Sequence, residues 1–303
     1  MALESSTRAV PVATPRPSGS FAPGVAGREF EFTERDFEAV RKLIHHRAGI
    51  SLPLQKMDMV YSRLARRLRA NGMKRFEDYI ALLNRAGAEA EWEAFTNALT
   101  TNLTSFFREA HHFPILAEHL RARRSGLLAV WCSAASTGEE AYSLAMTAVE
   151  AFGSFDAPVS ILASDVDTHV LGRGEAGIYP LERVERLSPE RMRRFFVRGT
   201  GNQEGLVKVR PELQRLVTFR PLNLLDAAWP VRGPFEAIFC RNVMIYFDKP
   251  TQAGILRRFA PLLQPDGLLF VGHSESLFHV ADVFRLRGKT VYERVPAGAR
   301  GGD

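Results

Sequence analysis

The chain has 303 residues, of which 46% are hydrophobic and 24% charged, with a formal net charge of +6. No apolar run approaches the ~20 residues that a membrane-spanning helix needs, which indicates a protein without direct membrane insertion. The positive charge favours an acidic partner, whether a nucleic acid, an anionic surface or an acidic protein. The two cysteines, Cys132 and Cys240, each end an apolar run. We therefore expect small core residues in a reducing cytoplasm, not a disulfide or a metal pair.

Residues 1–28 are rich in Ala, Pro, Ser, Thr and Gly, and we expect them to form a disordered tail. Residues 29–100 predict an all-helical domain of four helices. The first begins after Thr33, which with Asp36 resembles a capping box, and carries apolar residues at helical spacing up to Gly49. The other helices are marked by apolar residues around Leu64, Tyr79 and Phe95.

The second of these helices is strongly basic. Between Lys56 and Arg75 there are seven basic residues against one acidic residue, Asp58. Arg63, Arg66 and Arg67 share one helix face because they are spaced at i, i+3 and i+4. A solvated face is the ordinary explanation for such a cluster, but the bias in sign favours docking of an acidic partner.

After a linker at 101–126, the pattern changes at residue 127. Short apolar runs alternate with helix-like stretches such as 139–152 and 252–263, which predicts a doubly wound α/β sheet. The segment at about 178–216 does not fit this alternation. Its glycines, including Gly199 and Gly201, lie between two apolar pieces and indicate a small inserted β-subdomain. The end of the chain predicts an antiparallel hairpin with its turn near Gly288.

Polar residues follow the predicted strands, where open α/β sheets bind ligands. In the small-residue turn after the first strand, Glu139 either completes a capping box with Ser136 or faces the ammonium group of a ligand. After the second strand, Asp165 or Asp167 either caps a helix or binds a ribose, and we favour Asp165 as the ligand residue. The buried pair Arg241 and Asn242 needs polar partners.

Two further segments suit the same cleft. Tyr246, which follows the Arg-Asn pair, has core packing as its alternative role. The linker motif 100–108 combines hydroxyls, an amide, two aromatic residues and Arg108, and suits a segment that folds over a polar ligand. His111 and His112 have no cluster of metal ligands around them, so we expect them to be structural and the protein to hold no metal.

Taken together, these segments closely resemble the CheR family of chemotaxis receptor glutamate O-methyltransferases over roughly residues 30–295. The resembling stretches are RAGI (47–50), MDMVY (57–61), ALTTNLTSFFREAHHF (98–113), AASTGEE (134–140), SDVD (164–167) and CRNVMIYFD (240–248). The resemblance implies an N-terminal helical domain, an S-adenosylmethionine-dependent methyltransferase sheet and a small β-subdomain. It also implies that the substrates are cytoplasmic domains of chemotaxis receptors, with a C-terminal receptor peptide bound by the β-subdomain.

The resemblance further implies roles for individual residues. S-adenosylmethionine would contact Asn102, Thr104, Arg108, Glu139, Asp165, Asn223, Leu224, Arg241 and Asn242. Arg108 and Tyr246 would orient the reacting groups, and Gly199 and Gly201 would dock the substrate. The positive charge of Arg63, Arg66 and Arg67 predicts that they dock the substrate as well. S-adenosylhomocysteine would be the product. The alternative is a non-catalytic receptor-binding module that senses S-adenosylmethionine. A nucleic-acid methyltransferase is disfavoured because no Asn/Asp-Pro-Pro-aromatic motif stands after the strand that ends at Cys240.

Overall fold

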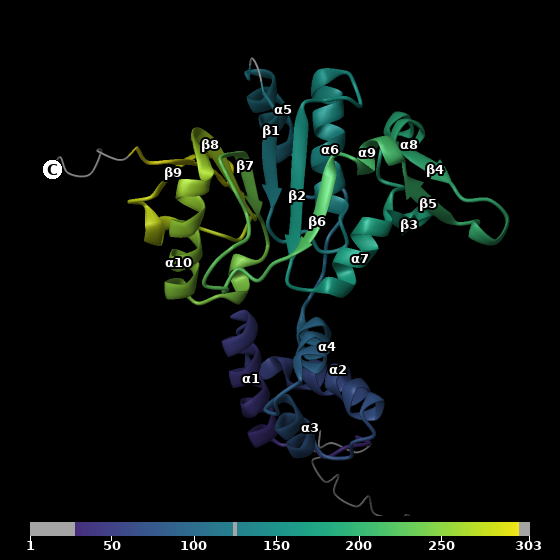
Figure 1. Cartoon of the computed structure of the whole chain (residues 1–303), viewed down its shortest axis with the longest axis vertical. Coiled ribbons are helices and arrows are strands. Elements are labelled where there is room, and N and C mark those ends of the chain that lie inside the picture. The colour runs from purple at the N-terminus through teal and green to yellow at the C-terminus, as the bar shows by residue number, and fades with distance from the viewer. Residues whose placement is uncertain (1–27, 124–125, 297–303) are drawn as a thin grey trace, which may run out of the picture.

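The computed structural model describes residues 28–123 and 126–296, which form a helical domain joined to a helix-covered sheet (Figure 1). The tail predicted at 1–28 lies outside the described residues except for Arg28. The helical domain contains α1 (Glu34–Ala48), α2 (Met57–Ala70), α3 (Phe76–Leu83) and α4 (Glu89–Leu99). Its own core is apolar and includes Phe37, Leu64 and Phe95. Four helices were predicted here, and four are described.

Local sequence accounts for the start of α1. The Thr33 hydroxyl accepts a hydrogen bond from the backbone N–H of Asp36, and the Asp36 carboxylate accepts one from the N–H of Thr33, so the predicted capping box is confirmed. The helix ends at Gly49, which takes a left-handed conformation. The second helix is shorter than its charge pattern suggested. Because α2 ends at Ala70, Lys74 and Arg75 lie beyond it.

The large sheet has seven strands in the order β6-β2-β1-β7-β8-β10-β9. The strands are β1 (Leu128–Cys132), β2 (Val159–Asp165), β6 (Val217–Pro221), β7 (Phe235–Cys240), β8 (Leu263–Val271), β9 (Phe284–Gly288) and β10 (Val291–Arg294). The first five in this order are parallel, whereas β10 is antiparallel to β8 and β9. The predicted fold, including its final hairpin, is confirmed.

Helices cover both faces of this sheet, because alternate residues of a strand point to opposite sides. Val130 and Cys132 pack in the core beneath α5 (His112–Arg121) and α6 (Glu139–Phe152), and Leu171 of α7 (Thr168–Ala176) joins this core. Trp131 packs in the core beneath α10 (Lys249–Phe259). Helix α5 lies inside the segment that was predicted to be only a linker, and α10 begins three residues earlier than expected.

A second, three-stranded antiparallel sheet lies between α7 and β6 in the chain and beside the main sheet in space (Figure 1). It consists of β3 (Ile178–Pro180), β5 (Leu206–Val209) and β4 (Phe196–Arg198), in that order, with α8 (Pro189–Phe195) and α9 (Pro211–Gln214). This is the small inserted β-subdomain that the sequence predicted.

Short 3-10 turns connect these elements. They are η1 (Leu54–Lys56), η2 (Leu181–Arg183), η3 (Gly201–Gln203), η4 (Met244–Tyr246), η5 (Ala260–Leu262) and η6 (Phe278–Val280). Within the described ranges, no helix is long and apolar enough to cross a membrane.

Candidate functional site

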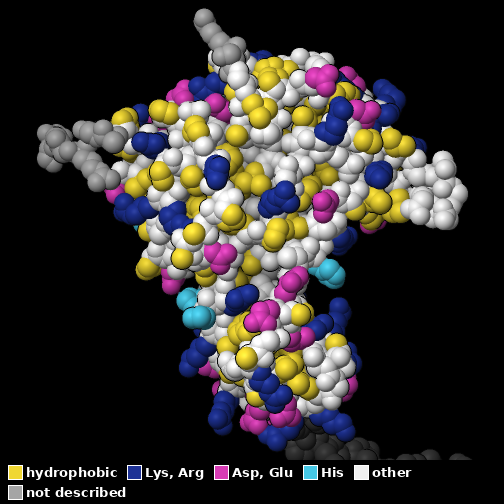
Figure 2. Space-filling model, in the orientation of Figure 1, with side chains coloured by type: hydrophobic (Ala, Val, Ile, Leu, Met, Phe, Trp, Pro, Cys, Tyr) yellow, Lys and Arg dark blue, Asp and Glu magenta, His cyan; other side chains and the backbone are white. Residues whose placement is uncertain are grey.

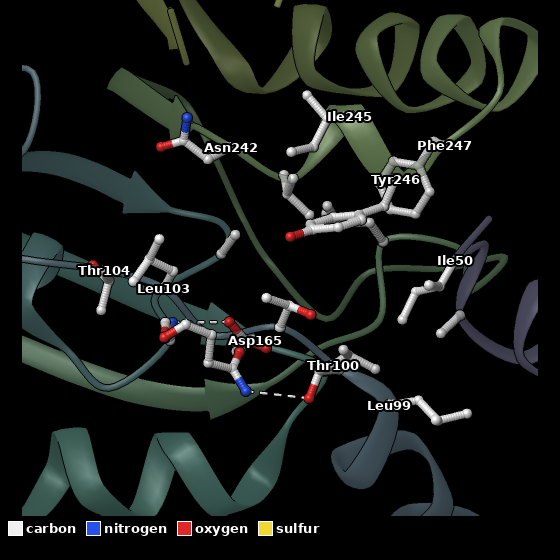
Figure 3. A pocket seen from close by; sticks show the side chains of 18 of the residues that line it. Ile50, Leu99, Thr100, Leu103, Thr104, Asp165, Asn242, Ile245, Tyr246 and Phe247 are labelled. Carbon is white, nitrogen blue, oxygen red and sulfur yellow. Dashed lines mark hydrogen bonds between the residues drawn. The ribbon is translucent and has the colours of Figure 1, made fainter. Parts of the chain in front are cut away.

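A cavity of about 330 Å³ lies where the carboxyl ends of β1, β2, β6 and β7 meet the helical domain. Such a position is where open α/β sheets bind ligands, and the volume falls in the range of ~300–1,000 Å³ typical of small-molecule sites. The helical domain supplies one wall through residues 48–59, and the linker crosses the cavity at residues 99–108. Figure 3 shows Ile50, Thr104, Asp165 and Tyr246 converging from these different parts of the chain.

Two aspartates, Asp165 and Asp167, lie at the end of β2, and the sequence left open which of them caps a helix and which binds a ligand. Asp167 caps α7, because its Oδ1 accepts from the backbone N–H groups of His169 and Val170. Asp165 lines the cavity, and its carboxylate accepts from the N–H groups of Ser136 (2.8 Å) and Asp167 (3.0 Å). Burial outweighs these hydrogen bonds and raises the pKa of Asp165 to about 6. Asp165 is therefore available to a ligand at neutral pH as a carboxylate.

The turn after β1 corrects one prediction. Helix α6 begins at Glu139, and its N-cap residue is Gly138, which has a left-handed backbone and no side chain to cap the helix, so no capping box forms between Ser136 and Glu139. Glu139 is fully buried but does not line the cavity, because its carboxylate is turned toward Thr137 (2.6 Å) and Arg183 (3.2 Å). The acidic residue of this turn that does line the cavity is Glu140. Glu139, which the sequence predicted to contact the ligand, therefore does not reach the cavity in this structure, whereas the adjacent Glu140 does.

Arg241 follows β7 and is the buried cation of the site. Its guanidinium lies 2.6 Å from Glu140 and 3.3 Å from Glu109, and it also donates to the backbone carbonyl of Arg108 (2.5 Å). The polar partners that a buried arginine requires are therefore present. Burial alone would raise the pKa of Glu109, but the charge of Arg241 and the N–H of His273 lower it below its ordinary value.

Asn242 is held by two acidic residues that the sequence reasoning missed. Its backbone N–H donates to Glu275 (2.9 Å) and its side-chain Nδ2 donates to Glu109 (3.3 Å). Since a carboxylate only accepts hydrogen bonds, Glu109 sets which end of the Asn242 amide faces away from it. Burial raises the pKa of Glu275. No sequence pattern around Glu109 or Glu275 indicated that either residue would contact Asn242.

The linker motif crosses the cavity as predicted, with Asn102, Thr104 and Arg108 all in its lining. Asn102 donates to Asp167 (2.8 Å), which ties the linker to the start of α7. Arg108 donates to the carbonyl of Leu103 (2.8 Å). Among the described residues, its guanidinium has no carboxylate partner within ion-pair distance, so its charge is available to a ligand.

The segments that follow β6 and β7 supply the other predicted site residues in the cavity lining. Asn223 and Leu224 follow β6, and Asn223 donates to the carbonyl of Arg47 in the helical domain (2.8 Å). Tyr246, in η4, extends its side chain into the cavity (Figure 3), while its backbone carbonyl accepts from the N–H of Ser51 (2.9 Å). Tyr246 is half-buried and lines the cavity, and it belongs to none of the described core clusters. These two hydrogen bonds fasten the helical domain to the rim of the cavity.

Non-glycine residues with left-handed backbone gather at this site. Phe107, Glu109, Ser136 and Asn242 have φ between 49° and 59°, and the two other such residues described, Lys289 and Thr290, lie in the final hairpin. Strained conformations of this kind persist where the surrounding structure fixes them, commonly at functional sites.

The proposed docking residues lie outside the cavity. Arg63 donates to the carbonyl of Thr100 (2.6 Å), and Arg67 forms an ion pair with Glu91 (2.5 Å). Only Arg66 of the three is exposed without a hydrogen bond or ion pair in the described structure. Lys and Arg side chains surround the helical domain in Figure 2, interspersed with Asp and Glu. Gly199 and Gly201 lie in the loop between β4 and β5.

The donor set matches the chemical groups of S-adenosylmethionine. It offers a strand-end carboxylate for ribose hydroxyls, a second carboxylate for an ammonium group, a guanidinium for a carboxylate, and apolar side chains such as Leu222 and Leu224 for a flat base. Among residues 28–123 and 126–296, no group of three or more His, Cys, Asp or Glu is arranged to hold a metal ion.

His112 is buried and hydrogen-bonded to the hairpin at Lys289 and Thr290, in agreement with a structural role.

Comparison with known proteins gives two family matches. Residues 102–293 match the SAM-binding domain of CheR methyltransferases, and residues 35–100 match their all-alpha domain. The chemotaxis protein methyltransferase of Klebsiella aerogenes is 57% identical over 277 residues, covering 91% of this chain and 95% of that protein. The Escherichia coli protein of the same name is 56% identical over 260 residues, covering 86% of this chain and 91% of that protein.

Proposed function

Because the chain belongs to the CheR methyltransferase family, we propose that it transfers the methyl group of S-adenosylmethionine to glutamate side chains of chemotaxis receptors in the cytoplasm. The observation that carries this proposal is the cavity at the strand ends, where Asp165 and the Glu140–Arg241 pair lie together. The relatives with 56–57% identity are named as chemotaxis protein methyltransferases, which supports an acceptor of the chemotaxis system. No feature of the site favours the non-catalytic alternative.

We assign the cofactor contacts from the positions of the lining residues. Asp165 accepts hydrogen bonds from the ribose hydroxyls, because it is the carboxylate at the end of β2. Asn223 and Leu224 flank the adenine. Glu140, in place of Glu139, faces the ammonium of the amino acid moiety, and Arg108 faces its carboxylate.

Asn102 and Thr104 hold the linker over the cofactor. Arg241 and Asn242 form the rim after β7, where Arg241 fixes Glu140 and the backbone of Arg108. S-adenosylmethionine supplies an activated methyl group and no acid–base chemistry.

The acceptor glutamate needs no general base. A solvated glutamate has a pKa of ~4.3 and is already a carboxylate at neutral pH. One of its oxygens forms a bond to the methyl carbon while the bond from that carbon to sulfur breaks, giving a γ-methyl ester and S-adenosylhomocysteine. The rate then depends on in-line positioning and on the exclusion of water. We assign this positioning to Arg108, which holds the methyl donor through the carboxylate of its amino acid moiety, and to Tyr246, which extends into the same cavity.

Two surfaces are proposed for receptor docking. Arg66, which is exposed and has no partner among the described residues, presents its positive charge on α2 to an acidic receptor helix, whereas Arg63 and Arg67 support this surface through internal contacts. In the inserted β-subdomain, β4 is an edge strand next to the loop with Gly199 and Gly201. An edge strand can pair with an extended peptide, which suits a C-terminal receptor segment.

The proposal is tested by transfer of labelled methyl from S-adenosylmethionine to purified receptor cytoplasmic fragments, with and without their C-terminal peptide. Base-labile label on glutamate is the expected result. Dependence on the peptide would support docking by the β-subdomain. Cofactor binding without label on any receptor fragment would instead support the sensing alternative, and steeply salt-dependent binding to DNA or RNA would support a nucleic-acid substrate.

A further inference from the structure

Arg183 connects the inserted β-subdomain to two parts of the cofactor site. It ends η2, which follows β3 in the subdomain. Its Nη2 lies 3.2 Å from the Glu139 carboxylate at the start of α6, and its Nη1 donates to the carbonyl of Thr104 in the linker (3.2 Å). One side chain of the subdomain therefore contacts both the turn after β1 and the linker segment that crosses the cavity.

The contact with Glu139 holds Arg183 in place. Glu139 is fully buried, and its Oε1, the oxygen that faces Arg183, has no hydrogen bond to any described residue. Within the described ranges, Arg183 is the cation that pairs with this carboxylate. A charge buried without a partner is strongly unfavourable, so the pair fixes the guanidinium against α6. The same guanidinium is then oriented toward the carbonyl of Thr104.

Other contacts join the subdomain to the same region. The Tyr179 hydroxyl of β3 donates to the carbonyl of Thr137 (2.7 Å). The ring of Phe106 packs edge-on against Tyr179 (5.1 Å between centroids) and Phe196 (5.6 Å). Thus linker residues Thr104 and Phe106 both contact the subdomain, a few residues before Arg108.

We propose that Arg183 is a positioning residue for cofactor binding, and that the inserted β-subdomain is in this way part of the cofactor site. Arg183 fixes the Thr104 carbonyl, and through it the linker that presents Thr104 and Arg108 to the cavity. This role is separate from receptor docking. It rests on the proposed function only in taking the cavity as the site of S-adenosylmethionine.

The test measures S-adenosylmethionine binding to the full chain by calorimetry, without any receptor. Arg183→Met should raise the Kd about ten-fold, the change expected from the loss of a hydrogen bond made by a charged group. Arg183→Lys should recover part of the affinity. Arg198→Met is the matched control, because Arg198 is an exposed arginine of β4 in the same subdomain, and its Kd should equal that of the wild type.

A second variant separates positioning from folding. In Arg183→Met, Glu139 is left as an unpaired buried charge, which could lower affinity by destabilising the chain. The double variant Glu139→Gln/Arg183→Met removes that charge, so its melting temperature should rise above that of the single variant while the Kd stays high. Recovery of wild-type Kd in the double variant would overturn the proposal. So would a single variant that binds S-adenosylmethionine as tightly as Arg198→Met, whether or not receptor methylation is observed.

Discussion

Glu140 and Arg241 face each other at the edge of the cavity, with 2.6 Å between carboxylate and guanidinium. Removing the charge of Glu140 leaves Arg241 with the more distant Glu109 (3.3 Å). We predict that Glu140→Gln raises the Kd for S-adenosylmethionine about ten-fold or more and lowers the melting temperature, since breaking one side of a buried pair is destabilising. Calorimetry and thermal unfolding measure the two effects. Glu118→Gln, at an exposed site on α5, is the control; equal behaviour of both variants would contradict the assignment.

Cofactor affinity should depend on pH through Asp165. Its pKa of about 6 means that the carboxylate becomes protonated as the pH falls through 6, and a protonated group can no longer accept from both ribose hydroxyls. Affinity measured from pH 7.5 to 5 should therefore decrease toward the acid end. Asp165→Asn should bind weakly throughout and without this pH dependence. A wild-type affinity that is constant over the range would rule out ribose binding by ionised Asp165.

The same shift predicts an effect on stability. The pKa of Asp165 is raised from an ordinary value of 3.8, so the unfolded chain releases this proton at lower pH than the folded chain does. Asp165 therefore opposes folding increasingly as pH rises from about 4 to about 6, and by a constant amount above that. Urea unfolding without ligand should show Asp165→Asn gaining stability relative to the wild type over this window, by up to about 3 kcal/mol. A difference that does not change with pH would contradict this origin of the shift.

On α2, neighbouring arginines should respond differently to charge reversal. Arg66→Glu should raise the KM for receptor fragments and leave folding and cofactor affinity unchanged, because Arg66 is exposed and without a described partner. Arg67→Glu should lower the melting temperature, because it places a second carboxylate beside Glu91, which also accepts a hydrogen bond from Tyr79 (2.6 Å). Unfolding curves and methylation kinetics distinguish the two. If Arg66→Glu keeps the wild-type KM, this face does not dock the receptor.

Arg108 and Tyr246 should affect the chemical step. With saturating cofactor and receptor fragment, Arg108→Ala and Tyr246→Phe should both lower the single-turnover rate, by about ten-fold or more, because orientation of the reacting groups is lost. Rapid-quench measurement of labelled ester gives the rate directly. Wild-type rates in both variants would remove these residues from the mechanism.

Local patterns predicted those elements that depend on local interactions. The capping box of Thr33 and Asp36 uses two residues three positions apart, and α6 spans the predicted residues 139–152 because small and apolar side chains continue to Gly153. Helix α5 was missed although its buried residues Phe113, Leu116 and Leu120 have helical spacing. The helical spacing was visible in the sequence, but the segment was assigned to the linker because it directly follows the polar motif at 100–108.

The direction of side chains could not be predicted in the same way. Glu139 and Glu140 are adjacent, and their partners Arg183 and Arg241 lie 44 and 101 positions further along the chain. Nothing near the two glutamates indicates which one turns toward the cavity. Likewise, the sequence predicted that Arg63 and Arg67 would be free to dock a partner. In the structure both contact α4, since Arg63 donates to the carbonyl of Ala98 and Arg67 pairs with Glu91. Tertiary partners, rather than local pattern, determined these outcomes.

The wall that residues 48–59 give to the cavity has a consequence for chimaeric proteins. The backbone N–H of Ser51 donates to the carbonyl of Tyr246, and Asn223 donates to the carbonyl of Arg47, so this wall is attached to the sheet on both sides of the ligand space. Exchanging the helical domain between two relatives would therefore change the residues that line the cofactor cavity as well as the surface that docks the receptor. The hybrid would inherit a different wall of its cofactor cavity, because the domain boundary near residue 100 runs through the residues that line the site.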